Sequence, residues 1–219
     1  MQDQSNREKV LKAIRNGLLD KTEAPFHENY LHKQVFKTIE EDIDLHFATQ
    51  FTAAGGKFIF CQNELEFAEK LVDLSQHKNW KQVMCIEPVL KSFLQECEIP
   101  FIDQTAEIEK PEVFVSSCES LIARHGSILT SSTQMIDELL WQQAKVHIVL
   151  AYNRQVVTDY KEALNMAQSN HPTQRSDQFT FINGPAKCQN YDPALDLKGI
   201  GPEELYLFLI ESENPNEQK

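Results

Sequence analysis

From Phe179 to Ser212 the chain reads FTFINGPAKCQNYDPALDLKGIGPEELYLFLIES. The apolar runs at its two ends, Phe179–Ile182 and Leu205–Ile210, have the length and the aromatic and aliphatic content of buried strands. The pair Gly184-Pro185 follows the first run, and Gly201-Pro202 precedes the second. Glycine permits positive φ and proline ends regular structure, so we expect two strands joined by a long loop. Such a loop is a common position for functional residues.

The bulk composition is that of an acidic globular protein. The 219 residues are 41% hydrophobic and carry a net charge of −12, enough for one α/β domain with a small helical arm. The acidic balance opposes nucleic-acid binding, because few cations remain to replace phosphate counterions. No apolar run approaches the ~20 residues of a membrane span, and the N-terminus lacks a secretory h-region. We therefore expect a cytoplasmic location.

The cysteines favour reduced thiols in a cytoplasm. Their number is odd, they are scattered, and no C-x-x-C pair occurs among Cys61, Cys85, Cys97, Cys118 and Cys188. This spacing suits neither a disulfide framework nor a zinc or iron–sulfur site. We expect no metal and no cofactor to be bound by this chain.

Apolar strands and amphipathic helices alternate along the chain. A capping box at Ser5–Glu8 predicts an N-terminal helix. Further helices are expected within 34–53, after Asn63, at Pro88 and from Tyr160 to Ala167. Strands are expected at 57–61, 81–86, 100–103, 113–115, 126–131 and 146–151, whereas 116–124 is read as a helical turn or an irregular segment. Alternation of this kind predicts a mostly parallel sheet with helices on both faces.

Two groups of polar residues lie in or after these strands. His147 alternates with apolar residues, which indicates a half-buried structural side chain. Ser116, Ser117 and Cys118 follow a strand, a position where a nucleophile could sit. Since no activating partner or nucleophile-elbow motif is present, we expect the thiol to be inert.

The two Gly-Pro pairs, with an acidic segment between them and a final strand, resemble the C-terminal end of the LUD domain. That domain characterises the lactate utilization protein C family, LutC or YkgG, and the resemblance extends from about Leu45 to Ser212. It implies a three-layer α/β architecture of the NagB/RpiA/CoA-transferase type. We expect a helical arm and linker at 1–33, the LUD domain at 34–212 and a polar tail at 213–219.

Two of the resembling motifs surround the Gly-Pro pairs. In the first, Gly184, Pro185 and Lys187 match, while the family's following Asp has only a displaced counterpart in Asp192. In the second, Gly201-Pro202 matches, but Ile200 stands where the family usually has His, so any role of that His is absent. A glycine turn with free N–H groups and one lysine can cradle an anion, although such turns are often only structural.

The third resembling motif is the segment from 120 to 129. Ala123, Gly126, Ser127 and Ile128 match the family, but Arg124 and His125 replace its Glu and Thr. A carboxylate has thus become a cation, and Arg can bind an anionic group through its bidentate fork. The alternative is that both side chains are merely solvated. The candidate binding residues are Arg124, His125, Gly126, Ser127, Gly184, Pro185, Lys187, Asp192, Gly201 and Pro202.

The resemblance implies a LutC-like component of a bacterial system that oxidises L-lactate to pyruvate. This chain would bind lactate or a similar small anion, and iron–sulfur partner subunits would carry electrons. Two alternatives remain open. The loss of three motif residues suits a non-catalytic ligand-binding or scaffolding paralogue, and the architecture also suits a CoA transferase or sugar-phosphate isomerase.

Overall fold

The computed structural model describes residues 6–19, 38–81, 83–102, 111–134, 138–171, 176, 178–186 and 201–212. The chain divides into two compact units, Met1–Thr38 and Ile39–Lys219. In the first unit, α1 (Asn6–Leu19) confirms the predicted N-terminal helix, and its apolar residues Val10, Leu11 and Ile14 are exposed. None of the helices among the described residues is long and apolar enough to cross a membrane.

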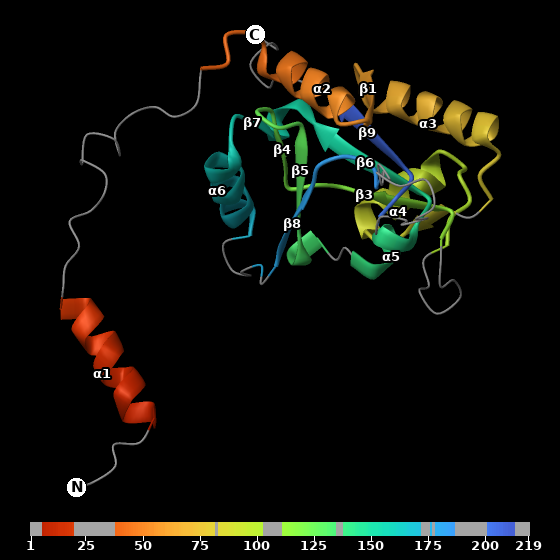
Figure 1. Cartoon of the computed structure of the whole chain (residues 1–219). Helices are drawn as coiled ribbons and strands as arrows, with labels where there is room; N and C mark the ends of the chain where they lie inside the picture. Colours follow the sequence, from red (N-terminus) through yellow and green to blue (C-terminus); the bar gives the residue numbers. More distant parts are fainter. Residues whose placement is uncertain are drawn as a thin grey trace, which may run out of the picture. The chain divides into compact units, whose positions relative to one another are not determined.

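The second unit is built on a five-stranded sheet in the order β1-β9-β6-β3-β2. All neighbouring strands in this sheet are parallel. The predicted final strand, β9, lies between β1 and β6 and is almost entirely buried, because both of its edges are paired (Figure 1). The strands are β1 (Lys57–Cys61), β2 (Val83–Cys85), β3 (Val113–Ser116), β6 (Val146–Tyr152) and β9 (Glu204–Ile210).

Helices cover both faces of this sheet, which confirms the α/β class with helix layers on either side. On one face, α3 (Glu64–Lys78) and α4 (Pro88–Glu96) pack against alternate strand residues such as Phe208. On the other face, α2 (Ile43–Ala53) and α5 (Glu138–Gln143) pack with the residues in between. Successive strand residues point to opposite faces, so one apolar strand supplies both cores.

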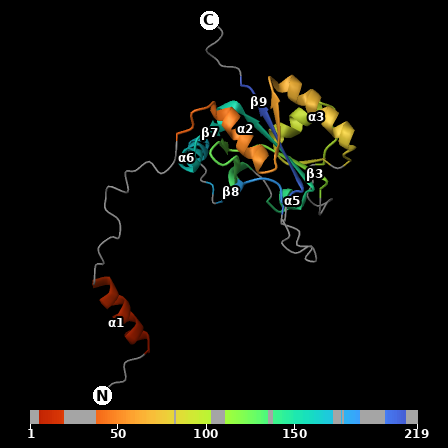
Figure 2. The same ribbon diagram turned by 45° about the horizontal axis from the view of Figure 1, so that its top comes forward.

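A second, four-stranded sheet lies on the α2 side of the main sheet, and the sequence did not predict it. Its order is β7-β4-β5-β8, with β5 antiparallel to both neighbours. α6 (Tyr160–Asn170) lies against this sheet (Figure 2). Its Ala163 and Ala167 pack with Ile122, Leu129 and Val157 of the sheet. The strands are β4 (Ser120–Ile122), β5 (Ser127–Ser131), β7 (Val156–Val157) and β8 (Phe179–Ile182).

Several local predictions need correction. The segment 116–124, read as a helical turn or irregular, contains β4, because its pairing with β5 buries Leu121 and Ile122. β8 is the last strand of the second sheet and is only partly buried. The expected strand at 100–103 is reduced to a single bridge between Ile102 and Met84 among the described residues.

Helix starts follow the local sequence signals. Asn63 caps α3 by accepting the backbone N–H of Glu66, as its capping sequence predicts. Pro88 opens α4, where its missing N–H costs nothing. α2 begins later than the residue 34 limit of the predicted range, because Asp42 accepts from the Asp44 N–H and ends the preceding irregular segment.

His147 is fully buried, which corrects the half-buried position predicted for it. The residue lies on β6, where its Nε2 is 2.8 Å from the hydroxyl of Ser116. Its ring stacks on Trp141 of α5 with centroids 5.5 Å apart. α5 and the second sheet cover this face of the main sheet. The resulting burial lowers the pKa of the His147 imidazole to about 3.

This depressed pKa makes folding sensitive to acid. The unfolded chain gains a proton at His147 near pH 6.5, whereas the folded protein resists protonation until about pH 3, so stability falls as the pH drops below 6.5. We expect His147 alone to remove about 2 kcal/mol of unfolding free energy between pH 7 and pH 5. Urea unfolding of the wild type and of His147→Gln at both pH values measures this loss, and an equal pH effect in the two proteins would contradict it.

Candidate functional site

The predicted residues Arg124, His125 and Gly126 form the turn between β4 and β5, and Ser127 opens β5. Arg124 is half-buried, and its backbone N–H donates to the Thr158 carbonyl over 3.3 Å. His125 is exposed, with its ring 4.8 Å from the Tyr160 ring at the start of α6. The turn therefore lies beside the start of α6, which the His125 ring contacts.

The glycines of the resembling motifs pack closely against α2. Gly126 has φ +64°, and a Cβ added there would lie 2.3 Å from the backbone nitrogen of Phe51. Gly184 has φ +120°, and its added Cβ would lie 2.7 Å from the Ala54 carbonyl oxygen. Only glycine fits both the backbone conformation and the space. These contacts give both glycines a packing role.

The two Gly-Pro pairs lie side by side, although a long segment separates them in sequence. The backbone N–H of Ala186 donates to the Pro202 carbonyl over 2.8 Å, and Gly201 approaches the Ala186 side chain. Lys187 and Asp192 lie outside the described residues. Anion binding by the predicted residues therefore stays a prediction.

These Gly-Pro pairs meet at the amino end of the parallel strands. Pro202 lies two residues before the start of β9, and the N–H of the intervening Glu203 donates to the Lys145 carbonyl just before β6. The seven residues of β9 separate this end from the carboxyl end by on the order of 20 Å at the usual strand rise. The sheet thus has two distinct edges on which a site could be built.

At the carboxyl edge, the connections after β2 and β3 leave toward opposite faces of the main sheet. The chain after β2 enters α4 on one face, and the chain after β3 enters the second sheet on the other. Ligands of open α/β sheets commonly bind where the connections diverge in this way. The first residues after these two strands are therefore candidates for a site.

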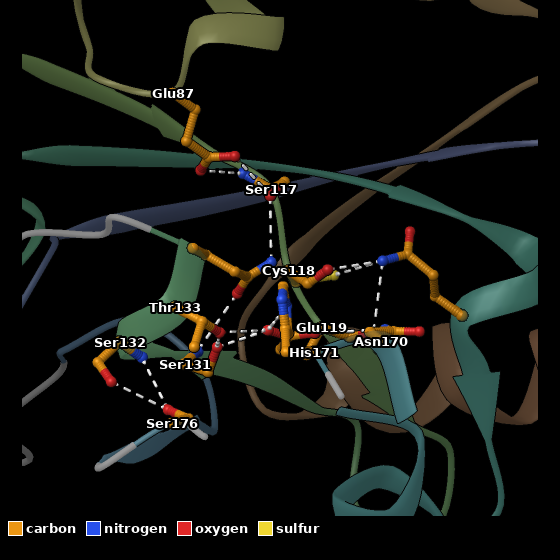
Figure 3. A network of polar contacts seen from close by, with 12 residues as sticks. Glu87, Ser117, Cys118, Glu119, Ser131, Ser132, Thr133, Asn170, His171 and Ser176 are labelled. Carbon is orange, nitrogen blue, oxygen red and sulfur yellow. Dashed lines mark hydrogen bonds and ion pairs between the residues drawn. The ribbon is translucent and has the colours of Figure 1, made fainter. Parts of the chain in front are cut away.

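Glu87 and Ser117 meet at this divergence. One oxygen of the Glu87 carboxylate accepts the Ser117 backbone N–H over 2.8 Å, and the other accepts the Ser117 hydroxyl over 2.6 Å (Figure 3). The Gln134 amide donates to the same hydroxyl over 3.2 Å, which leaves the hydroxyl hydrogen for Glu87. Burial raises the pKa of the Glu87 carboxyl, while the two bonds from Ser117 act in the opposite direction.

A second buried carboxylate, Glu119, lies further along the same connection. It is 2% exposed, and one oxygen accepts the Ser131 hydroxyl over 2.5 Å and contacts His171 Nε2 at 2.9 Å. Thr133 and Asn170 add longer hydrogen bonds of 3.3 and 3.4 Å. Figure 3 shows His171 and Asn170, from the end of α6, converging on Glu119. Glu119 therefore ties the second sheet to α6.

The thiols near this edge are not prepared for nucleophilic attack. Cys118 is buried, its sulfur lies 3.9 Å from the Gln155 amide, and burial raises its thiol pKa strongly. Burial also raises the pKa of Cys85 to about 12. Both stay protonated at neutral pH, in agreement with the expectation that Cys118 is inert. No group of three potential metal ligands occurs among the described residues.

Sequence reasoning missed Glu87, Ser117, Glu119 and Gln134 as members of one network. The available signal was that Glu87 follows one predicted strand and Ser117 and Glu119 follow the next, because carboxyl ends of adjacent parallel strands meet. Gln134 carried no signal, since η3 (Ser132–Gln134) returns from the second sheet to reach Ser117.

The family match agrees with this architecture. Residues 103–210 match the LUD domain, and the chain is a member of the LUD-domain family. The match begins later than the resemblance expected from about Leu45. In general terms, the family connects the chain with lactate utilization.

The structure of a DUF162 family protein from Deinococcus radiodurans is similar, with a TM-score of 0.58 over 77% of this chain and 96% of that chain. The two sequences are 14% identical, so this likeness shows the fold alone. None of the curated proteins compared matches the chain.

The close approach of Gly126 to α2 predicts a large effect of one methyl group. Gly126→Ala forces a Cβ against the Phe51 backbone at a positive φ, so we expect the unfolding free energy to fall by at least about 2 kcal/mol. Urea denaturation followed by circular dichroism measures this loss. Gly17→Ala is the control, because nothing lies within 4 Å of its added Cβ. Equal stabilities of the two variants would show that α2 can move away from the added Cβ at little cost.

Removal of the Glu119 side chain should be similarly costly. Glu119→Ala leaves the buried Ser131 hydroxyl without its carboxylate acceptor and His171 without its partner, so we expect a loss of about 2–4 kcal/mol. Glu69→Ala, on the exposed side of α3, should stay within about 0.5 kcal/mol of the wild type. Thermal and urea unfolding provide the measurement, and a loss no larger than that of the control would exclude an anchoring role.

Proposed function

We propose that this protein is a LutC-like component of a bacterial L-lactate utilization system. The system as a whole oxidises L-lactate to pyruvate. The observation that carries the proposal is the LUD-domain match over 103–210, which includes the β4–β5 turn, the carboxyl edge after β3 and both Gly-Pro pairs. This region also holds Arg124 and His125, two of the residues that distinguish the chain from the family pattern. We therefore expect the functional residues to lie within 103–210.

The chain's own contribution in this proposal is to bind a small anion, lactate or a similar carboxylate. Arg124 supports it, because a half-buried guanidinium can pair with a carboxylate through two parallel hydrogen bonds. The neighbouring imidazole of His125 is exposed and can approach the same ligand. Lys187, which follows the first Gly-Pro pair in sequence, is the third cation of the proposed set.

Electron transfer is assigned to partner subunits. Oxidation of lactate to pyruvate releases two electrons and two protons, and the electrons require an acceptor. The scattered cysteines of this chain do not have the spacing of iron–sulfur ligands. We therefore propose that iron–sulfur partner proteins accept the electrons, and that this chain acts with them.

A second candidate function is a carboxylate-dependent enzyme acting on a CoA ester or a sugar phosphate. The observation that favours it is the buried carboxyl of Glu87 at the diverging strand ends, with a pKa raised by burial. A buried carboxyl with a raised pKa is typical of general acid–base residues. The two candidates differ in their ligands, so binding separates them.

The test is calorimetric titration of the full chain with L-lactate, pyruvate, a sugar phosphate and a CoA ester. We expect L-lactate or pyruvate to bind, and Arg124→Gln to weaken that binding at least about tenfold by removing a charge-assisted pair. Arg15→Gln, on α1, is the matched control and should bind normally.

Binding of only a sugar phosphate or a CoA ester would favour the second candidate. Failure of all four ligands would leave a scaffolding paralogue as the better description. A growth test gives an independent readout, since cells lacking this protein should fail to oxidise L-lactate. Normal lactate oxidation in such cells would reject the first candidate.

A further inference from the structure

The helix α1 carries an exposed aliphatic stripe. It belongs to the first compact unit and lies outside the region that matches the LUD domain. Its residues Val10, Leu11 and Ile14 are 57%, 52% and 54% exposed. Residues three and four apart are neighbours on an α-helix, so Ile14 adjoins both Leu11 and Val10 on one face. These three side chains form the aliphatic stripe of α1.

The charge of α1 is opposite to that of the rest of the chain. The helix has a net charge of +3 from the basic residues Arg7, Lys9, Lys12 and Arg15 and the acidic Glu8. The whole chain carries −12, so the remainder carries −15. Lys9, Lys12 and Arg15 recur every three residues and form a row on the side of the helix away from the aliphatic stripe. α1 is therefore a basic amphipathic helix on an acidic protein.

This combination favours an anionic lipid surface as the partner of α1. A second copy of α1 would bring like charges together, which opposes pairing of the helix with itself. A face rich in Lys and Arg opposite an aliphatic face is typical of helices that lie in the interface of a bilayer. A bilayer also accepts a narrow stripe without a groove shaped to receive it.

The length of α1 agrees with a position along the surface. At 1.5 Å per residue its 14 residues extend about 21 Å, which is less than the ~30 Å of a bilayer's hydrocarbon core. Arg7 stands at the amino end of the aliphatic stripe, where its long side chain can extend past the apolar residues and keep its charge at the headgroups. The helix therefore suits lying on a membrane and does not suit spanning one.

We propose that α1 attaches this protein to the surface of a bilayer that contains anionic phospholipids. The aliphatic stripe enters the boundary between headgroups and acyl chains, and the row of Lys9, Lys12 and Arg15 faces the lipid phosphates. The acidic remainder of the chain is repelled by the same surface, so the attachment is reversible. The inference goes beyond the proposed function and does not depend on the ligand of the second unit.

The experiment is co-sedimentation of the full chain with lipid vesicles. Mixed phosphatidylglycerol–phosphatidylcholine vesicles provide the anionic surface, and vesicles of phosphatidylcholine alone provide the neutral one. We expect binding to the mixed vesicles and at least about tenfold weaker binding to the neutral ones, because three net positive charges lose their attraction. Equal binding to both kinds of vesicle, or to neither, overturns the proposal.

One pair of variants tests the basic row. Lys9→Gln combined with Lys12→Gln should weaken binding to the mixed vesicles at least about tenfold, and glutamine preserves helix propensity. Lys145→Gln combined with Lys161→Gln is the matched control, because it removes the same charge from exposed positions of the second unit. We expect this control to bind as the wild type does. Equal losses in the two double variants would show that net charge acts without α1.

A second pair of variants tests the aliphatic stripe. Val10→Gln combined with Ile14→Gln should also weaken binding at least about tenfold, because less apolar surface enters the bilayer. Leu65→Gln combined with Val89→Gln removes two exposed apolar side chains from the second unit and should bind normally. Circular dichroism checks the folding of every variant.

Sedimentation velocity without lipid distinguishes a protein partner from a bilayer. We expect the wild type and the Val10→Gln, Ile14→Gln variant to have the same mass. A larger mass for the wild type that the variant loses, together with no binding to vesicles, would show that a second copy covers the stripe and would overturn the proposal.

Discussion

The parallel pairing of β9 between β1 and β6 is the constraint on which the rest of the domain depends. β9 is buried along nearly its whole length, and its alternate residues supply two different cores. A strand that is apolar on both faces is stable only when both faces are covered. That requirement accounts for α3 and α4 on one side and for α2, α5 and the second sheet on the other.

Covering both faces also creates the polar edge. The connections after β2 and β3 leave toward opposite faces, and backbone groups at their starts need new partners. Glu87 supplies acceptors for the Ser117 N–H and hydroxyl at that point. The Glu119 network then fixes the second sheet to α6. The residues that link the elements at this edge are thus also the ones that could take part in chemistry.

The motif glycines illustrate how a sequence signal can have a structural cause. Gly126 is required by close contact with the backbone of α2, and Gly184 by close contact with Ala54, the residue that ends this helix. A Cβ added at either glycine would lie less than 3 Å from a backbone atom. A glycine turn read in isolation suggests a cradle for an anion. In the folded chain, the same absence of a side chain admits a helix. In the same turn, Arg124 is half-buried and His125 is exposed.

The parallel strands, the helix starts at Asn63 and Pro88 and the α/β class could be predicted from the sequence, because periodicity and capping act within a few residues of the chain. Three features could not be predicted: the strand at 120–122, the complete burial of His147, and the meeting of Glu87, Ser117 and Gln134. Each of these depends on contacts between residues distant in sequence. The β4–β5 pairing, the α5 cover and the return of the chain at Gln134 have no local signature, so their consequences are visible only in the folded chain.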